Sequence, residues 1–258
     1  MNTIKKMKST FFSFAIFITA WANAAVAAEI VIASSPSVPP FIVQGENGAE
    51  DTGIEIDIAR AALNAAGHTV KFQNLPYTRA LAYLKAGRVD GSLTISATAT
   101  LDIGSAVKSD IHLIFDNVAM TLEENNLEIN SIDDLADKSI IAFNFAKEVL
   151  GEEYTKMANA NPNYRQMLPN TKQIPPTLHA KRAQVAIIEE TIYKYHLNNE
   201  TYPVDVTAPI TIHRIFPRNP FTVAFKDVSV RDDFNKGLAI IKENGTYQKI
   251  FESYTGEQ

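Results

Sequence analysis

The chain has 258 residues, of which 24 are Lys or Arg and 29 are Asp or Glu, and it contains no cysteine. Residues 1–28 carry three lysines and no acid, so the remainder has 21 basic and 29 acidic residues and a net charge of −8. This charge disfavours nucleic acid and anionic membrane surfaces as partners. Without cysteine, the chain forms no disulfide and offers no thiolate to zinc or iron.

The first 28 residues have the pattern of a secretory signal peptide. Lysines at positions 5, 6 and 8 precede an apolar segment over 11–22, which is too short to span a bilayer as an ordinary helix. The small residues at 25–28 suit cleavage after Ala27 or Ala28, and this pattern favours a cleaved leader over a membrane anchor. With no cysteine to carry a lipid, the mature protein is expected to be free in the periplasm of a Gram-negative cell.

Residues 30–98 alternate between strand and helix patterns. An apolar strand over 30–33 precedes a turn at 37–41, a helix that follows Gly53 and ends at Gly67, and a strand over 69–72. A second helix follows Pro76 and ends at Gly87, and a third strand ends in the polar segment 94–98. This order predicts a right-handed parallel α/β sheet, whose ligands bind beyond the carboxyl ends of the strands. The turn and the polar segment are therefore expected to line a pocket, and His68 is expected in a solvated loop.

The rest of the chain continues the mixture of strands and helices. Ser131 and Asp134 have the spacing of a capping box for a short helix. We expect strands over 139–143, 184–189, 210–216 and 221–225, and helices from about 146 to 160, over 190–196 and over 230–244.

Several short segments, in this order and spacing, resemble the periplasmic solute-binding proteins of amino-acid ABC importers, family 3 of the extracellular solute-binding proteins. They are the Pro-Pro-Phe turn at 39–41 with Gly-Ile-Glu-Ile-Asp-Ile at 53–58, then 84–91, 131–138 and the segment from 221 to the C-terminus. The resemblance implies an α/β fold of the type II periplasmic-binding-protein class. In it, two lobes, each a mostly parallel sheet flanked by helices, enclose a ligand cleft.

The resemblance also implies that the chain crosses twice between the lobes. After the signal peptide at 1–28, the first lobe is expected to hold residues 29–117 and 219–258, and the second lobe residues 118–218. The segment 217–220 is then the return crossing.

Catalytic patterns are missing from the sequence. The five histidines have no metal-binding spacing, and there is neither a Gly-x-Ser-x-Gly segment nor a Walker-type phosphate loop. We therefore expect a binding protein rather than an enzyme, with no metal or other cofactor.

Family members hold the ligand's α-carboxylate with an arginine and nearby hydroxyls, and Ser96 and Thr98 match the hydroxyl positions. The family arginine is replaced by Leu101, which cannot bind a carboxylate. Either another cation has taken over, or the ligand is not a simple α-amino acid. The hydroxyls of Ser96 and Thr98 would equally suit ordinary capping at the end of a strand.

Two other cations are candidates for an anionic group of the ligand. Arg79 follows Pro76 and Lys147 follows Asn144, each in the first turn of an expected helix, where the helix dipole disfavours positive charge. A bound anion would remove this conflict, and Asn144 is included in the expected site. The alternative is that both cations are solvated, with Lys147 paired to Glu148.

The expected site is completed by aromatic residues and one acid. Tyr77 is the preferred ligand-packing aromatic, and Phe41 fits either the cleft or the core, while Val38 occupies a position that is often aromatic in the family. Glu189 ends a buried strand where the family places its amine-binding aspartate. Its alternative role is to cap the following helix. Arg214, near the return crossing, is a further candidate without a motif.

These features favour a monomeric protein that binds a small polar, amino-acid-like solute and delivers it to an ABC permease. A sensor that acts through a membrane receptor would have the same fold and cleft. A dehydratase-like enzyme on this fold is a third alternative, disfavoured because no acid–base pair is evident.

Export is tested by mass spectrometry of the protein recovered from the periplasm. The mature chain should start at Ala28 or Glu29, because the small residues before them suit signal peptidase. Recovery of a chain that retains residues 1–27 would contradict the prediction.

Overall fold

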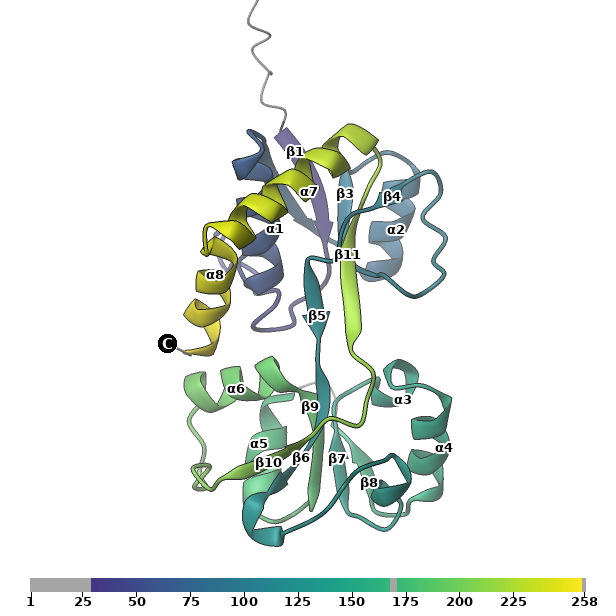
Figure 1. The fold of residues 1–258 in the computed structure, drawn as a ribbon, viewed down its shortest axis with the longest axis vertical. Helices are drawn as coiled ribbons and strands as arrows, with labels where there is room; N and C mark the ends of the chain where they lie inside the picture. Colours follow the sequence, from purple (N-terminus) through teal and green to yellow (C-terminus); the bar gives the residue numbers. More distant parts are fainter. Residues whose placement is uncertain (1–28, 168–170, 257–258) are drawn as a thin grey trace, which may run out of the picture.

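The computed structural model describes residues 29–167 and 171–256, and the expected signal peptide lies outside these residues. The described chain forms two α/β lobes, each built on its own sheet, and two segments of chain join them (Figure 1). The predicted two-lobed α/β fold is therefore confirmed.

The first lobe has a sheet in the order β2-β1-β3-β11-β4, with β5 also paired to β11. Helices α1 and α7 pack against each other beside this sheet, and α8 closes the chain (Figure 1). The strands are β1 (Glu29–Ser34), β2 (Thr69–Asn74), β3 (Gly91–Ser96), β4 (Val107–Lys108), β5 (Leu113–Phe115) and β11 (Asn219–Phe225), and the helices are α1 (Ile54–Ala65), α2 (Tyr77–Lys85), α7 (Val228–Glu243) and α8 (Thr246–Thr255).

The second lobe has a sheet in the order β10-β6-β9-β7-β8. Its strands are β6 (Asn117–Leu122), β7 (Ile140–Ala142), β8 (Tyr164–Gln166), β9 (Val185–Glu189) and β10 (Ile210–His213). Its helices are α3 (Ala146–Val149), α4 (Glu152–Ala160), α5 (Ile174–His179) and α6 (Glu190–Asn199), with short 3₁₀ turns at Glu123–Asn125, Asp133–Leu135 and Thr171–Gln173.

Both sheets are mixed, whereas the sequence resemblance implied mostly parallel sheets. Three strands run parallel in each, β2-β1-β3 in the first and β8-β7-β9 in the second. The strands next to the crossings, β5, β6, β10 and β11, pair antiparallel because they enter each sheet from the side of the other lobe. The short strand β4 adds a further antiparallel pairing with β11.

The crossings bring the carboxyl ends of the parallel strands to the gap between the lobes. Asp116 is the single residue between β5 and β6, one residue before the expected boundary. The next residue, Asn117, pairs with Glu189 at the carboxyl end of β9. In the first lobe, Phe221 pairs with both Leu113, near the crossing, and Ser96, at the carboxyl end of β3. The same edge of each sheet therefore faces the other lobe.

A buried polar group connects α1 to the first sheet. One carboxylate oxygen of Glu55 lies 3.1 Å from Nε2 of His112 and accepts the backbone N–H of Thr94 at 2.7 Å. The other accepts the Thr94 hydroxyl, also at 2.7 Å. Both side chains of the Glu55–His112 pair are fully buried, so Glu55 has a structural role.

Three local predictions differ from the structure. His68 is not a solvated loop residue, because α7 packs beside α1 and brings Asp233 within 3.0 Å of its ring. The Asp134 carboxylate accepts the Ser131 N–H as a capping box predicts, but the short helix it precedes is a 3₁₀ turn. The helix expected from 146 to 160 is broken into α3 and α4 at Gly151, whose φ of 94° is left-handed.

Gly237 permits the close approach of α7 to α1, since a Cβ added there would lie 1.8 Å from the carbonyl oxygen of Ala62. Gly237→Ala should therefore destabilise the fold by about 1–3 kcal/mol through overpacking. Helix propensity alone would predict a gain of about 1 kcal/mol. Lys236→Ala, at the exposed neighbouring position, should change stability by less than about 0.5 kcal/mol. Urea denaturation measures both, and a more stable Gly237→Ala variant would contradict the packing argument.

Candidate functional site

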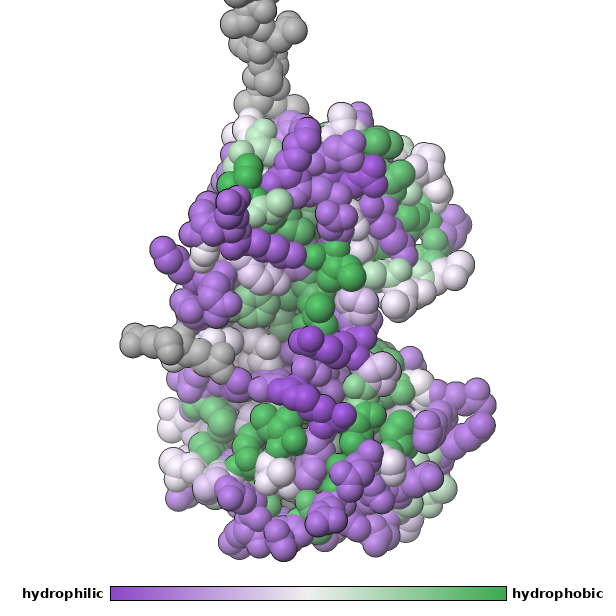
Figure 2. All heavy atoms as spheres, viewed as in Figure 1, coloured by the Kyte–Doolittle hydropathy of each residue, from purple (hydrophilic) through white to green (hydrophobic). Residues whose placement is uncertain are grey.

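Polar residues from both lobes lie at the edges that face each other, and Figure 2 shows the surface hollowed between the lobes at its right side. In the first lobe, Tyr77 and Arg79 begin α2 just beyond β2, while Ser96 and Thr98 lie at the end of β3. In the second lobe, Asn144 follows β7 and Glu189 ends β9. These are the residues that the strand order brings to the inter-lobe gap.

Two other hollows in the described surface contain none of the predicted site residues. One, of about 350 Å³, is lined by α5 and residues 200–204. The other, of about 420 Å³, lies beside β2 and residues 48–51. Neither is bordered by the carboxyl ends of the parallel strands.

The segment after β3 is fixed by a lysine that sequence reasoning missed. The ammonium group of Lys108, on β4, donates to the carbonyl oxygens of Ser96 at 2.8 Å, Ala99 at 3.1 Å and Ala97 at 3.4 Å. The hydroxyl of Ser96 also accepts the N–H of Ala99 and lies 3.3 Å from the Thr98 hydroxyl. No sequence signal marked Lys108, because the loop that brings its ammonium group back to carbonyl oxygens 9 to 12 residues earlier follows no recognisable pattern.

Arg79 is exposed in the first turn of α2, and among the described residues its guanidinium has no hydrogen bond or ion pair. The first turn of this helix contains no acid and no side-chain cap. Tyr77, at the start of the same helix, is half-buried, and burial raises the pKa of its hydroxyl. Leu101 packs partly buried against the small core of which Tyr77 is also a neighbour.

Phe41 and Lys147, both expected at the site, have partners elsewhere. Phe41 is only 1% exposed, and its ring centroid lies 4.3 Å from that of Phe115 in the core. The ammonium of Lys147 donates to Asn159 at 2.7 Å and lies 5.0 Å from the ring centroid of Tyr164. Tyr164 pairs with the amino-terminal end of β7, so this contact draws Lys147 away from the edge that faces the first lobe.

Asn144 keeps a position at the facing edge. Its side-chain oxygen accepts a weak hydrogen bond, 3.4 Å long, from Gln166 at the carboxyl end of β8. Asn144 follows β7 and Gln166 ends β8, and these two strands are parallel neighbours. The two amide side chains add uncharged polar groups to the second-lobe side of the gap.

Glu189 caps α6, the alternative that its sequence position left open. Its carboxylate accepts the N–H of Ile192 at 2.8 Å, the Thr191 hydroxyl at 3.2 Å and the N–H of Asp116 at 3.3 Å. The residue is 3% exposed. Burial raises the pKa of Glu189 to about 7, although these hydrogen bonds act in the opposite direction. The protonated and ionised forms of this carboxyl are therefore similarly populated near neutral pH.

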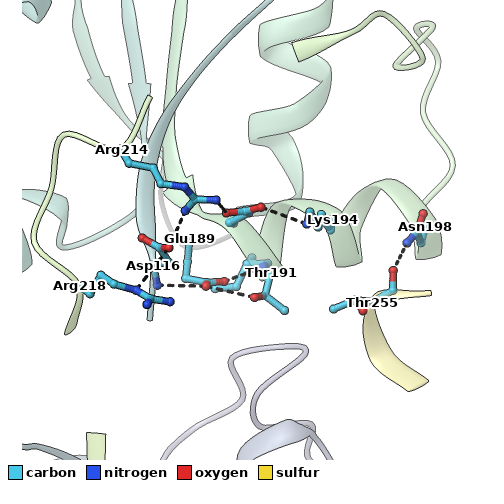
Figure 3. A network of polar contacts seen from close by, with 10 residues as sticks. Asp116, Glu189, Thr191, Lys194, Asn198, Arg214, Arg218 and Thr255 are labelled. Carbon is cyan, nitrogen blue, oxygen red and sulfur yellow. Dashed lines mark hydrogen bonds and ion pairs between the residues drawn. The ribbon is translucent and has the colours of Figure 1, made fainter. Parts of the chain in front are cut away.

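An ion-pair network surrounds the crossing residue Asp116. Arg214, on the return crossing, donates to Asp116 at 2.5 Å and to Glu190 at 2.6 Å. Figure 3 shows Arg214 and Arg218 converging on Asp116, with the Arg218 contact longer at 3.6 Å. Arg214 thus links the two crossing segments to the start of α6. The sequence placed it near the crossing without showing its partners.

Within residues 29–167 and 171–256, no group of three or more His, Asp or Glu side chains is arranged to hold a metal ion. None of the helices in the same residues combines the length and apolar character that a membrane span requires.

The model of the bacterial extracellular solute-binding proteins, family 3, matches residues 30–257. The two-lobed arrangement is that of a type II periplasmic binding protein. The chain belongs to this family, as its sequence motifs suggested.

Comparison with known proteins agrees with this assignment. The arginine-binding extracellular protein ArtP of Bacillus subtilis is 22% identical over 235 residues, which are 89% of this chain and 88% of ArtP. The substrate-binding protein of an amino acid ABC transporter has a similar structure, with a TM-score of 0.56, 24% identity, and coverage of 89% of this chain and 100% of that one. A histidine kinase sensor domain similar to periplasmic binding proteins gives a TM-score of 0.61 at 19% identity, covering 89% and 97%.

The raised pKa of Glu189 predicts a pH dependence of folding stability. Because the folded state favours the protonated carboxyl, wild-type stability relative to Glu189→Gln should fall as pH rises from about 4.5 to about 7, then level off. The change should be at most about 3 kcal/mol. Urea denaturation at several pH values measures it.

Glu190→Gln is the matched control. Burial raises the pKa of Glu190, but contacts with Lys194 and Arg214 outweigh it and lower the pKa. The ionised Glu190 carboxylate therefore stabilises the fold above about pH 4.5, and this stabilisation is lost only when the pH falls below that value. Between pH 4.5 and 7 the Glu190→Gln difference should stay flat, and a flat profile for Glu189→Gln as well would contradict the burial argument.

Proposed function

We propose that this protein binds a small polar, amino-acid-like solute in the gap between its lobes and delivers it to an ABC permease. The observation that carries the proposal is the alignment of the parallel strand ends of both sheets on facing edges, joined by two crossings. Family membership supports it, because proteins of this family bind small molecules and supply ABC permeases. The names of ArtP and of the similar ABC transporter protein favour an amino acid.

The lobes of the proposed protein comprise residues 29–117 with 219–258, and 118–218. Its contacts with the solute are Tyr77, Arg79, Ser96, Thr98 and Asn144. Phe41, Lys147 and Glu189 are left out because their side chains have other partners. The leader at 1–28 and the absence of cysteine support release into the periplasm. We further propose that the protein acts as a monomer and has no catalytic activity.

A sensor function is the second candidate, and the similarity to a histidine kinase sensor domain favours it. Deletion of the gene separates the two roles. Loss of uptake of the radiolabelled solute would support transport. Unchanged uptake with loss of a solute-induced transcriptional response would support sensing.

A thermal-shift screen against amino acids, small peptides and organic acids tests whether a solute binds. A ligand at a hundredfold excess over its Kd stabilises the folded protein by about 2.7 kcal/mol. Trp21 is the only tryptophan and lies in the expected leader, so a dye rather than tryptophan fluorescence should report unfolding. No shift with any of these solutes would contradict the proposal.

Arg79→Ala should weaken binding of the solute found in that screen by roughly tenfold to a hundredfold. A charge-assisted hydrogen bond contributes about 1.5–3 kcal/mol, and Arg79 has no competing partner among the described residues. The fold should survive, because Ala80 and Leu84 still bury the inner face of α2. Calorimetry measures the affinity.

Arg88→Ala is the control for Arg79→Ala, since Arg88 is an exposed cation beyond the opposite end of α2. The Arg88→Ala variant should bind the solute with the affinity of the wild type. If a folded Arg79→Ala variant binds the solute as tightly as the wild type, Arg79 is a surface cation that does not contact the solute.

A further inference from the structure

Phe145 has an unusual backbone conformation and an unusually exposed ring. It is 60% exposed, the highest value among the exposed large hydrophobic residues of the described chain. Its φ of 65° is left-handed, and it is the one aromatic among the described non-glycine residues with positive φ. This conformation is unfavourable for a bulky residue, and residues held in it cluster at functional sites. Neither feature is explained by packing within the second lobe.

Phe145 lies at the edge of the second sheet that faces the first lobe. It follows β7, whose carboxyl end lies beside that of β9 at the edge facing the first lobe. Figure 1 places α3, which begins just after Phe145, at the upper edge of the lower lobe and on the same side as the β3–β4 connection of the upper lobe. Val149, one turn further along α3, is also exposed, at 46%.

The first lobe offers only one of the aromatics that were expected to pack on a ligand. Phe41 is buried in the core, and Val38 occupies the position where an aromatic was expected. Tyr77 remains, half-buried at the start of α2, beyond the carboxyl end of β2. An aromatic from the second lobe would supply the missing surface.

We infer that Phe145 and Tyr77, on opposite lobes, enclose the side chain of the solute when the lobes close. This inference rests on the proposed function and specifies the solute class. Two rings that approach from opposite sides favour a flat group, such as a guanidinium, an amide or an aromatic ring, over a flexible alkyl chain. Closure about the two crossing segments is the hinge motion that would bring the rings together.

The experiment compares flat and non-flat amino acids of similar size. L-arginine, L-glutamine and L-phenylalanine are the flat probes, with L-lysine and L-leucine as their non-flat partners, and calorimetry measures each Kd. Phe145→Leu keeps an apolar side chain without the ring, and Phe145→Gly removes the side chain while glycine tolerates the left-handed φ. Ile240→Ala removes an exposed apolar side chain of α7 as the control.

The wild type should bind at least one flat probe more tightly than its non-flat partner. Phe145→Leu should weaken that binding roughly tenfold and reduce the preference for the flat probe. Phe145→Gly should also bind weakly, yet unfold at a temperature close to that of the wild type, which shows that the loss is not one of folding. Ile240→Ala should bind like the wild type.

Other outcomes overturn the inference in distinguishable ways. Wild-type affinity in folded Phe145→Leu and Phe145→Gly variants, or a wild-type preference for L-lysine or L-leucine over the flat probes, would overturn this inference and leave the proposed function intact. Failure of the wild type to bind any of the five amino acids would overturn the inference and count against an amino-acid solute.

Discussion

The double crossing of the chain is the constraint on which the rest of the structure depends. Because a single residue, Asp116, separates β5 from β6, the second sheet starts where the first ends. The parallel strands of both sheets are thereby forced to point their carboxyl ends at the same gap. Arg214 joins the two crossings through Asp116, but it is half exposed, and such ion pairs usually contribute less than about 1 kcal/mol. The network therefore fixes geometry more than it adds stability.

Much of the fold could be predicted because burial of one face gives each strand or helix a characteristic spacing of apolar residues. The alternation of apolar strands with helices that end at glycine located β1, α1, β2 and α2, and the strands over 184–189 and 221–225 were also found. The parallel arrangement of β2-β1-β3 was predicted correctly. The antiparallel pairings could not be predicted from these local patterns, since they join segments about a hundred residues apart. The contact of His68 with Asp233 escaped prediction for the same reason.

The site was less predictable than the fold, because a side chain's role depends on its neighbours in space. Glu189 was expected at its strand end, but only the structure shows its carboxylate capping α6. Lys147 was expected at the site because of its place in the helix dipole, whereas contacts with Asn159 and Tyr164 orient its side chain. The role of Phe145 could not be predicted, since a left-handed φ at a residue other than glycine leaves no mark in the sequence.

The ammonium of Lys108 behind the segment 96–99 has a consequence for the kinetics of association. All its donors are directed at carbonyl oxygens, so this segment is ordered before any solute arrives. A solute that docks there pays little conformational entropy for ordering the backbone. In the proposed function, the first lobe would therefore capture the solute at a rate set mainly by diffusion. The second lobe would then control how long the solute stays, and selectivity would appear in the dissociation rate.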